Sequence, residues 1–358
     1  MQLGERLRLT LFGTSHGPRV GALLEGVPKG LRVDETAIAQ AMATRRPGGR
    51  YASKRKEQDC VEFLSGIVEG KTTGASIELS IENQDAKSKD YNFLPHHPRP
   101  GHQDMVMHKR TKGEADLRGG GMSSARLTAP LVAAAAFVAP LLAPLGIKAE
   151  AQVGAIGNVE AGEMEHQPAR WSTDACKEMR CRDPDAAEAM IHLVESQRMN
   201  LNSIGSRVDL IVTGTPLGLG EPWFDGIEPA MARAMMSIPA ARGVTFGRGF
   251  NVVNMTGLQH NDAWGGSPES PTPLGERPDG VLAGLATSAP IRCSVAFKPP
   301  SSIASEQKTL HLESGAIEPL TVKGRHDPVL GPRAVAVVEA MAILVLTDLA
   351  LRGGFIDG

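Results

Sequence analysis

The sequence predicts an α+β fold, in which groups of strands and helices follow one another without strict alternation. Strand-like segments come first, helix-like segments follow, and both kinds return in the second half of the chain. The sequence has no short-period repeat typical of a solenoid and no low-complexity linker that would divide it. We therefore expect a single domain over residues 1–358.

Six segments are expected to form strands, because they alternate apolar and polar residues or form short apolar runs between turn residues. They are residues 7–12, 20–27, 61–67, 75–81, 207–212 and 293–297. The chain also contains 40 glycines and 25 prolines, which predict many turns between short elements.

Helices are expected where capping residues and proline mark their starts. Asp34 precedes a helix toward Arg45, Asp183 precedes one at Pro184, and Pro332 begins a long one that ends near Leu351. Residues 127–147 carry no charge and are long enough to cross a bilayer. Alanine supplies most of their apolar character and three prolines interrupt them, so we expect a buried, broken helix and no membrane span.

The charge balance and the cysteines restrict the classes of partner. With 38 basic and 40 acidic residues the formal charge is -2, which provides no strong field toward nucleic acid or an anionic membrane. Cys60, Cys176, Cys181 and Cys293 lack Cys-x-x-Cys spacing, and residues 1–6 contain no apolar signal core. We expect free thiols in a cytoplasmic protein.

The segment Gly13-Thr14-Ser15-His16-Gly17 matches G-x-S-x-G, the nucleophile elbow of α/β-hydrolases. An elbow requires a helix directly after the serine, whereas the residues that follow here predict a strand. A serine hydrolase that uses Ser15 is therefore the less favoured alternative.

Other patterns resemble ligand motifs without matching them. Residues 66–72 are one residue too short for a P-loop and predict a hairpin turn, and no G-x-G-x-x-G motif indicates a Rossmann site. Residues 54–56 are too short a basic run for a nucleic-acid patch. No metal site is expected, because no zinc spacing relates His96, His97, His102 and His108, and nearby prolines prevent a helix that would align them.

Several segments combine glycine with arginine, serine or histidine, as a site for a multiply charged anion would require. Glycine permits close approach of the backbone, and arginine matches phosphate and carboxylate oxygens. The segments are residues 45–50, 99–102, 118–126 and 324–328. Together they predict a phosphorylated small acid as ligand.

With residues 13–17, 87–91, 218–222 and 298–303, these segments resemble chorismate synthase motifs in the family's order over nearly the whole chain. The resemblance implies conversion of 5-enolpyruvylshikimate 3-phosphate to chorismate and phosphate, with reduced FMN and no net redox change. It also implies a β-α-β sandwich with helices between antiparallel sheets, assembled as a homotetramer. NADPH is implied as a candidate reductant.

The resemblance also implies roles for individual residues. His102 would protonate the departing phosphate, His16 would protonate or stabilise the reduced flavin, and Asp327 would assist proton removal. The substrate would be bound by Arg45, Arg50, Arg118 and Arg126, of which Arg45 and Arg50 also match positions assigned to NADPH. The flavin would contact Met122, Ser123, Ser124, Pro239, Ala240, Ala283, Lys298, Pro299, Pro300, Ser301, Ser302 and Arg325.

The sequence departs from the family pattern mainly where flavin is expected. Thr14, Leu127 and Thr245 replace the usual glutamates, and residues 276–280 replace a stretch that usually carries asparagine, histidine and paired glycines. Met122 replaces an arginine, which removes a permanent charge. A chorismate-synthase-like protein with altered or lost activity is therefore a second alternative.

Overall fold

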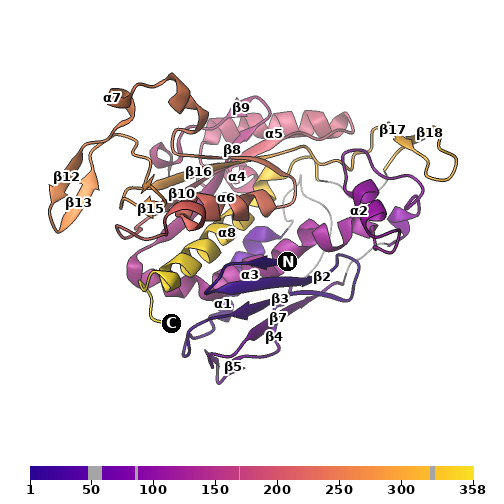
Figure 1. Ribbon diagram of the computed structural model, residues 1–358. Coiled ribbons are helices and arrows are strands. Elements are labelled where there is room, and N and C mark those ends of the chain that lie inside the picture. Colours follow the sequence, from indigo (N-terminus) through magenta and orange to yellow (C-terminus); the bar gives the residue numbers. More distant parts are fainter. Residues whose placement is uncertain (47–58, 85–87, 169, 323–326) are drawn as a thin grey trace.

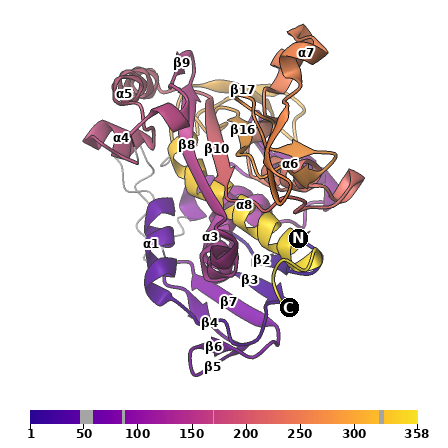
Figure 2. The ribbon, with the colours of Figure 1, turned by 90° about the vertical axis from the view of Figure 1, so that its left-hand side faces the viewer.

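A computed structural model describes residues 1–46, 59–84, 88–168, 170–322 and 327–358. Two antiparallel five-stranded sheets enclose a layer of helices (Figure 1), and Figure 2 shows this layer between the sheets. The arrangement confirms the predicted α+β class and the sandwich of helices between antiparallel sheets.

The first sheet comes from the N-terminal part of the chain and has the order β1-β2-β3-β7-β4. Its strands are β1 Gln2–Leu3, β2 Arg8–Gly13, β3 Arg19–Glu25, β7 Ile77–Glu82 and β4 Glu62–Phe63. In β3, the buried Val20, Ala22 and Leu24 share the face that packs on the helices. The predicted strand 61–67 is divided between β4 and β5 Ile67–Val68, and β5 forms the expected hairpin with β6 Lys71–Thr72.

The second sheet has the order β11-β16-β10-β8-β9. Its strands are β11 Ala241–Phe246, β16 Ile291–Phe297, β10 Ser206–Thr213, β8 Lys148–Ile156 and β9 Val159–Glu160. Besides β5–β6, the described residues form three more small hairpins outside both sheets: β12 Trp264–Ser267 with β13 Ser270–Pro273, β14 Val281–Leu282 with β15 Leu285–Ala286, and β17 Gln307–Leu310 with β18 Ile317–Leu320.

The helical layer is built around α3 Thr128–Val138 and α8 Gly331–Arg352. Helix α3 packs on β3 and β7, α8 packs on β8 and β10, and the two helices contact each other. Every residue of α3 except Ala136 is buried, and its alanines allow neighbouring elements to approach closely. The core therefore extends from one sheet through both helices to the other.

The other helices cover the edges of this core or carry loops. They are α1 Glu35–Arg45, α2 Asp104–Arg110, α4 Asp174–Met179, α5 Pro184–Met199, α6 Ile227–Ser237 and α7 Gly257–His260. The 3₁₀ helices are η1 Ser88–Tyr91, η2 Arg118–Ser123, η3 Ala125–Leu127, η4 Ala139–Leu145, η5 Met164–His166, η6 Trp223–Asp225 and η7 Gly249–Asn254. As predicted, Asp34 accepts from Ala37 N at 2.9 Å and Asp183 from Ala186 N at 3.1 Å.

Two helical stretches are long and apolar enough to span a membrane, but both are mostly inside the protein. In Arg118–Leu145 and Gly331–Arg352, 67% and 89% of the most apolar window is buried. Residues 127–147 include α3 and then η4, which contains Pro144. The expected buried, broken helix is confirmed.

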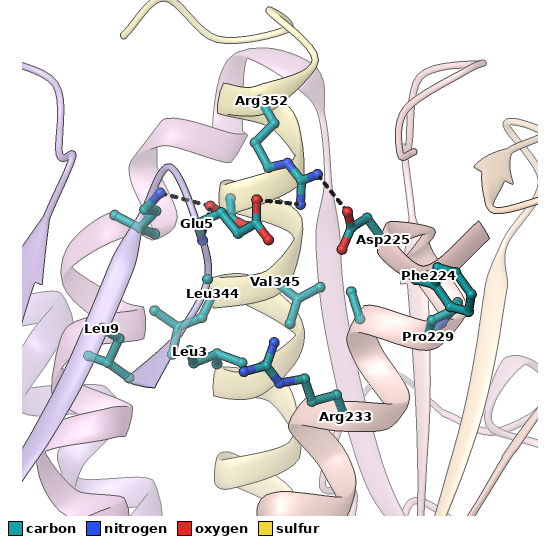
Figure 3. A pocket seen from close by; sticks show the side chains of 14 residues that line it. Leu3, Glu5, Leu9, Phe224, Asp225, Pro229, Arg233, Leu344, Val345 and Arg352 are labelled. Carbon is teal, nitrogen blue, oxygen red and sulfur yellow. Dashed lines mark hydrogen bonds and ion pairs between the residues drawn. The ribbon is translucent and has the colours of Figure 1, made fainter. Parts of the chain in front are cut away.

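Asp348, on α8, anchors the N-terminal segment to the helical layer. Its Oδ1 accepts from the backbone N–H groups of Glu5, Arg6 and Leu7 at 3.1, 2.7 and 2.8 Å. A small hollow of about 60 Å³ adjoins this contact, and Figure 3 shows Arg352 beside it between Glu5 and Asp225. The turn before β2 is thus fixed to the centre of the molecule.

Candidate active site

A turn of three consecutive glycines in η2 organises the candidate site. Gly119, Gly120 and Gly121 have φ values of 61°, 97° and 54°, a region that side chains disfavour. A Cβ on Gly119 would lie 2.6 Å from His16 Cε1, and one on Gly121 would lie 2.4 Å from Asp116 O. Glycine is therefore required both for the backbone conformation and for the close approach of His16.

The loop between β2 and β3 brings His16 to this turn. Ser15 N donates to Gly121 O at 3.2 Å, and Ser15 Oγ donates to Arg118 O at 3.1 Å. The His16 ring meets the Tyr91 ring edge-on, with 5.2 Å between centroids. Ser15 is only 1% exposed and leads into strand β3, so it lacks both the access and the following helix that a nucleophile elbow requires.

His102 lies on the other side of the same turn, where a Cβ on Gly120 would be 3.8 Å from its Cε1. His102 Nδ1 is 2.6 Å from Asp104 Oδ1. Arg99 Nη2 is 2.8 Å from the same oxygen and 3.0 Å from His102 Nδ1. Because arginine only donates, Asp104 Oδ1 is the acceptor for both side chains, which places the proton of His102 on Nδ1.

Asp104 is completely buried and ionised. Burial alone would raise the pKa of its carboxyl, but hydrogen bonds from Arg99 and His102, together with their positive charge, outweigh burial and lower the pKa well below its ordinary value. Arg99 Nε donates to Oδ2 at 2.7 Å, so the pair is held at both carboxylate oxygens. Asp104 thereby fixes the orientation of the His102 ring.

Residues 298–302, after β16, approach this group from the second sheet. Arg99 Nη1 donates to Ser302 Oγ at 3.1 Å. Ser301 Oγ donates to Gly101 O at 2.8 Å, and Lys298 Nζ donates to Gly101 O at 2.5 Å. The predicted cofactor segment and the His102 segment are therefore in direct contact.

Two further predicted cofactor positions have backbone conformations that are unusual for alanine. Ala240 and Ala283 have φ values of 71° and 52°. Ala240 O accepts from Lys298 N at 3.0 Å, which joins the Pro239–Ala240 position to the 298–302 segment. Ala283 lies at the tip of the β14–β15 hairpin and is exposed.

The predicted substrate arginines Arg45 and Arg126 share one buried carboxylate. Arg45 Nη1 donates to Asp59 Oδ2 at 2.9 Å, and Arg126 Nη1 donates to Asp59 Oδ1. Arg126 Nε also donates to Asn83 Oδ1 at 2.7 Å. Asp59 therefore links Arg45 at the end of α1 to Arg126 at the end of the segment 118–126.

Arg118 and Met122 lie at the surface of the same segment. Arg118 Nε and Nη2 are both 2.8 Å from the oxygens of Asp116, and its side chain borders an open hollow of about 470 Å³. Met122 is 46% exposed. Ser123 is exposed, and Ser124 Oγ accepts from Arg126 N at 3.2 Å.

Asp327 begins the segment that leads into α8, and Arg333 donates to its Oδ2 at 2.5 Å. The neighbouring Pro328 O accepts from Ile204 N at 2.9 Å, while Ser203 Oγ donates to Pro300 O at 2.7 Å. Residues 203–204 therefore hold the Asp327 segment beside the 298–302 segment. The predicted site residues Arg50 and Arg325 lie outside the described residues.

The positions that depart from the family pattern have different surroundings. Leu127 is buried in the core, whereas Thr245 lies in β11 within the second sheet. Arg277 pairs with Glu163, and Asp279 lies 3.3 Å from His260. These charges on residues 276–280 thus have partners within the chain.

Sequence reasoning missed residues that orient the predicted ones. Arg99 belongs to a motif that was recognised, but its pairing with Asp104 gave no sequence signal. Asp59 follows a segment without a distinctive pattern, and its two arginines come from distant positions. Tyr91 contacts His16 and also lies 5.4 Å from the Arg99 guanidinium carbon.

Comparison with known proteins assigns the family. The chorismate synthase family model matches residues 7–351. The chorismate synthase of Aeropyrum pernix is 46% identical over 353 residues, covering 98% of this chain and 92% of that protein. The chorismate synthase of Methanosarcina mazei is 39% identical over 355 residues, with coverage of 99% and 97%. A crystal structure of chorismate synthase superposes with a TM-score of 0.75 at 28% identity, covering 98% and 93% of the two chains. This chain belongs to the chorismate synthase family.

Proposed function

We propose that this chain eliminates phosphate from 5-enolpyruvylshikimate 3-phosphate in an anti-1,4 reaction and forms chorismate, with reduced FMN as cofactor. Family membership supports the reaction. Within the molecule, the observation that carries the proposal is the position of His16 and His102 against consecutive glycines of one turn. Two histidines held at one short backbone segment can serve two parts of a single site.

His102 is the proposed acid for the departing phosphate. Loss of a phosphate dianion requires a proton donor at its bridging oxygen and cations nearby. Since Nδ1 faces Asp104, Nε2 is the atom of His102 that can donate to the phosphate. Buried Asp104 holds the ring in this orientation.

Asp327 and His16 have the remaining proton-transfer roles in this proposal. Asp327 assists removal of the proton from the substrate carbon, and Arg333 orients its carboxylate. His16 holds a proton beside the flavin position, packed between Gly119 and Tyr91. The Asp327 segment lies beside residues 298–302, and the loop that carries His16 contacts the glycine turn.

The four arginines are proposed to attract and hold the substrate's phosphate and carboxylates. Arg118 is exposed, so it can exchange Asp116 for a ligand oxygen. Arg45 and Arg126 donate to buried Asp59, so we assign them long-range attraction of the anionic substrate and no direct contact with it. Arg50 completes the proposed set and lies outside the described residues.

The residues present suit a flavin with a phosphate group. Burial lowers the pKa of Lys298 from its ordinary value, and the positive charge of Arg242 lowers it further, so these two cations lie close together. A phosphate between them would relieve their repulsion. When bound, reduced FMN supplies an electron-rich ring beside the reacting carbons. The proposed FMN site comprises residues 122–124, 239–240, 283 and 298–302 with Arg325, and NADPH near Arg45 and Arg50 is the candidate reductant.

We also propose a cytoplasmic homotetramer of single-domain chains. Exposed large apolar side chains support association between copies. They include Trp223, Phe224, Phe250, Leu258 and Trp264, which are 82, 86, 81, 97 and 52% exposed.

Anaerobic incubation with enolpyruvylshikimate phosphate and chemically reduced FMN tests the reaction. Chorismate absorbance and free phosphate should rise in equal amounts, and neither should rise with oxidised FMN. Binding of flavin and substrate without turnover would instead support a family member with altered activity. Ester hydrolysis that Ser15→Ala abolishes would support the hydrolase alternative.

A further inference from the structure

Three histidines and two glutamates from separate parts of the chain meet where the β17–β18 hairpin packs on residues 95–98. His96 and His97 come from the segment before Arg99, and His311, Glu313 and Glu318 come from the hairpin. The backbone fixes this contact, because Leu312 N donates to His96 O at 2.9 Å. Thr309 Oγ1 also donates to Pro98 O. The side chains therefore face one another across a formed interface.

His97, His311 and Glu318 are the most enclosed members of this cluster. Their ligand atoms all lie within 4.8 Å of one another, and each residue is half-buried. His97 Nε2 lies 2.8 Å from Glu318 Oε2, and the His97 and His311 rings are 4.6 Å apart at their centroids. Ligand atoms on a tetrahedral zinc ion are roughly 3.4 Å apart, so rotation of side chains is sufficient to form a site.

The chemistry of the cluster also suits a transition metal. Glu318 supplies a carboxylate, an oxygen ligand that is anionic near neutral pH. Ser314 Oγ lies 2.9 Å from His311 Nδ1 and 3.4 Å from Glu318 Oε1. Ser314 N also donates to His311 Nδ1 at 3.1 Å, so the turn holds the His311 ring beside Glu318.

We propose that His97, His311 and Glu318 bind a divalent transition-metal ion, with zinc the best match, and that water completes its coordination. Two imidazoles and one carboxylate form a donor set that zinc prefers. The ion would displace the proton shared by His97 and Glu318 and link the hairpin to the segment before Arg99. Sequence spacing predicted no metal site at His97, because the other ligands lie more than two hundred residues away along the chain, as the His97–Glu318 separation of 221 shows.

His96 and Glu313 form an outer pair with a different expected role. His96 Nδ1 lies 3.1 Å from Glu313 Oε1, and the two side chains are 46% and 70% exposed. The His96 and His311 rings stack with 6.0 Å between centroids. Because this pair is more exposed than the inner three residues, we do not include His96 or Glu313 among the metal ligands.

Zinc titration of the untagged full-length chain, after removal of metal by a chelator, tests the site. Competition with a chromogenic chelator should give one zinc ion per chain. Affinity should fall at least about tenfold in His97→Ala, His311→Ala and Glu318→Gln, because each substitution removes a ligand. His96→Ala should retain binding, as should His166→Ala, which alters another surface histidine beside a glutamate, Glu163.

Thermal unfolding provides a second measurement that does not depend on catalysis. Zinc should raise the unfolding midpoint of the wild-type chain and of His166→Ala, and leave that of Glu318→Gln unchanged. The Gln variant keeps the shape of the side chain, so it separates ligand loss from failure to fold. Equal zinc affinity in the wild type and Glu318→Gln would overturn the site. Loss of binding in His96→Ala, with retention in His97→Ala, would overturn the proposed ligand set.

Discussion

His102 Nδ1 lies 2.6 Å from Asp104 Oδ1, a contact that decides which nitrogen of the His102 ring can meet a substrate. The same carboxylate binds Arg99 through both of its oxygens. The orientation of the proposed acid thus depends on a buried ion pair. The first two predictions separate the role of the imidazole from that of the pair behind it.

His102→Ala should lower the turnover number about 10²–10⁴-fold, because the departing phosphate loses its proton donor. FMN affinity should change little. Anaerobic phosphate release and flavin fluorescence titration measure the two effects, and His108→Ala is the matched control on α2. A turnover number equal to that of the wild type would remove His102 from the proposed acid role.

Asp104→Asn should lower both stability and turnover. Removing one partner of a buried ion pair costs about 3–5 kcal/mol of the free energy of unfolding. The folded pKa of Asp104 lies below its unfolded value, so its stabilising contribution is present above the unfolded pKa and is lost only as pH falls toward the folded pKa. The destabilisation by Asp104→Asn should therefore be constant from pH 6 to 8, as measured by urea unfolding.

Asp116→Asn provides the control for that measurement, because its pair with Arg118 is exposed. Asp116→Asn should lower the free energy of unfolding by less than about 1 kcal/mol. Equal losses of unfolding free energy in Asp104→Asn and Asp116→Asn would show that burial does not increase the contribution of the Arg99–Asp104 pair to stability.

Glu339→Gln should stabilise the protein at alkaline pH. Burial raises the pKa of Glu339 from 4.5 to about 7, although its Oε1 accepts from Ala151 N at 2.8 Å. Since the folded pKa is the higher one, ionisation destabilises the protein as pH rises from about 4.5 to 7, by up to about 3 kcal/mol. Unfolding midpoints at pH 5 and 8 should differ less in Glu339→Gln than in the wild type.

The exposed Glu188 on α5 provides the comparison for that substitution. Glu188→Gln should leave the pH dependence of the wild type intact. Identical pH profiles for Glu339→Gln and the wild type would contradict the raised pKa.

Asp59→Asn should cost about 3–5 kcal/mol of the free energy of unfolding, because it removes the buried carboxylate that pairs with both Arg45 and Arg126. Glu62→Gln, which weakens an exposed pair with Arg19, should cost less than about 1 kcal/mol. Urea unfolding of both variants gives the comparison. Similar losses of unfolding free energy in Asp59→Asn and Glu62→Gln would show that the Asp59 carboxylate is not a major source of stability.

Local signals were sufficient for much of the fold. The caps at Asp34 and Asp183 and the proline at the start of α8 involve neighbouring residues, so the sequence contains the whole interaction. Strand β8 was not predicted, because alanine and glycine give it weak strand preference. Its pairing with β10 along Lys148–Ile156 supplies the missing stabilisation. Helix α6 begins after Gly226 without a side-chain cap, so its start also lacked a signal.

The candidate site was predictable to the extent that its motifs are contiguous. Residues 99–104 and 118–126 could be recognised as units, and the structure brings His16 and His102 to the same glycine turn. The sequence could not show that Arg45 and Arg126 share Asp59, because this arrangement depends on packing between distant segments. Their predicted substrate role remains a proposal.

The attachment of Glu5, Arg6 and Leu7 to Asp348 has a consequence for synthesis of the protein on the ribosome. Helix α8 packs on the second sheet and also binds the turn before β2, yet it is translated after both sheets. Until α8 emerges, the nascent chain carries apolar surface that this helix later covers. Chaperones that bind nascent chains should therefore remain associated until the final helix has been translated.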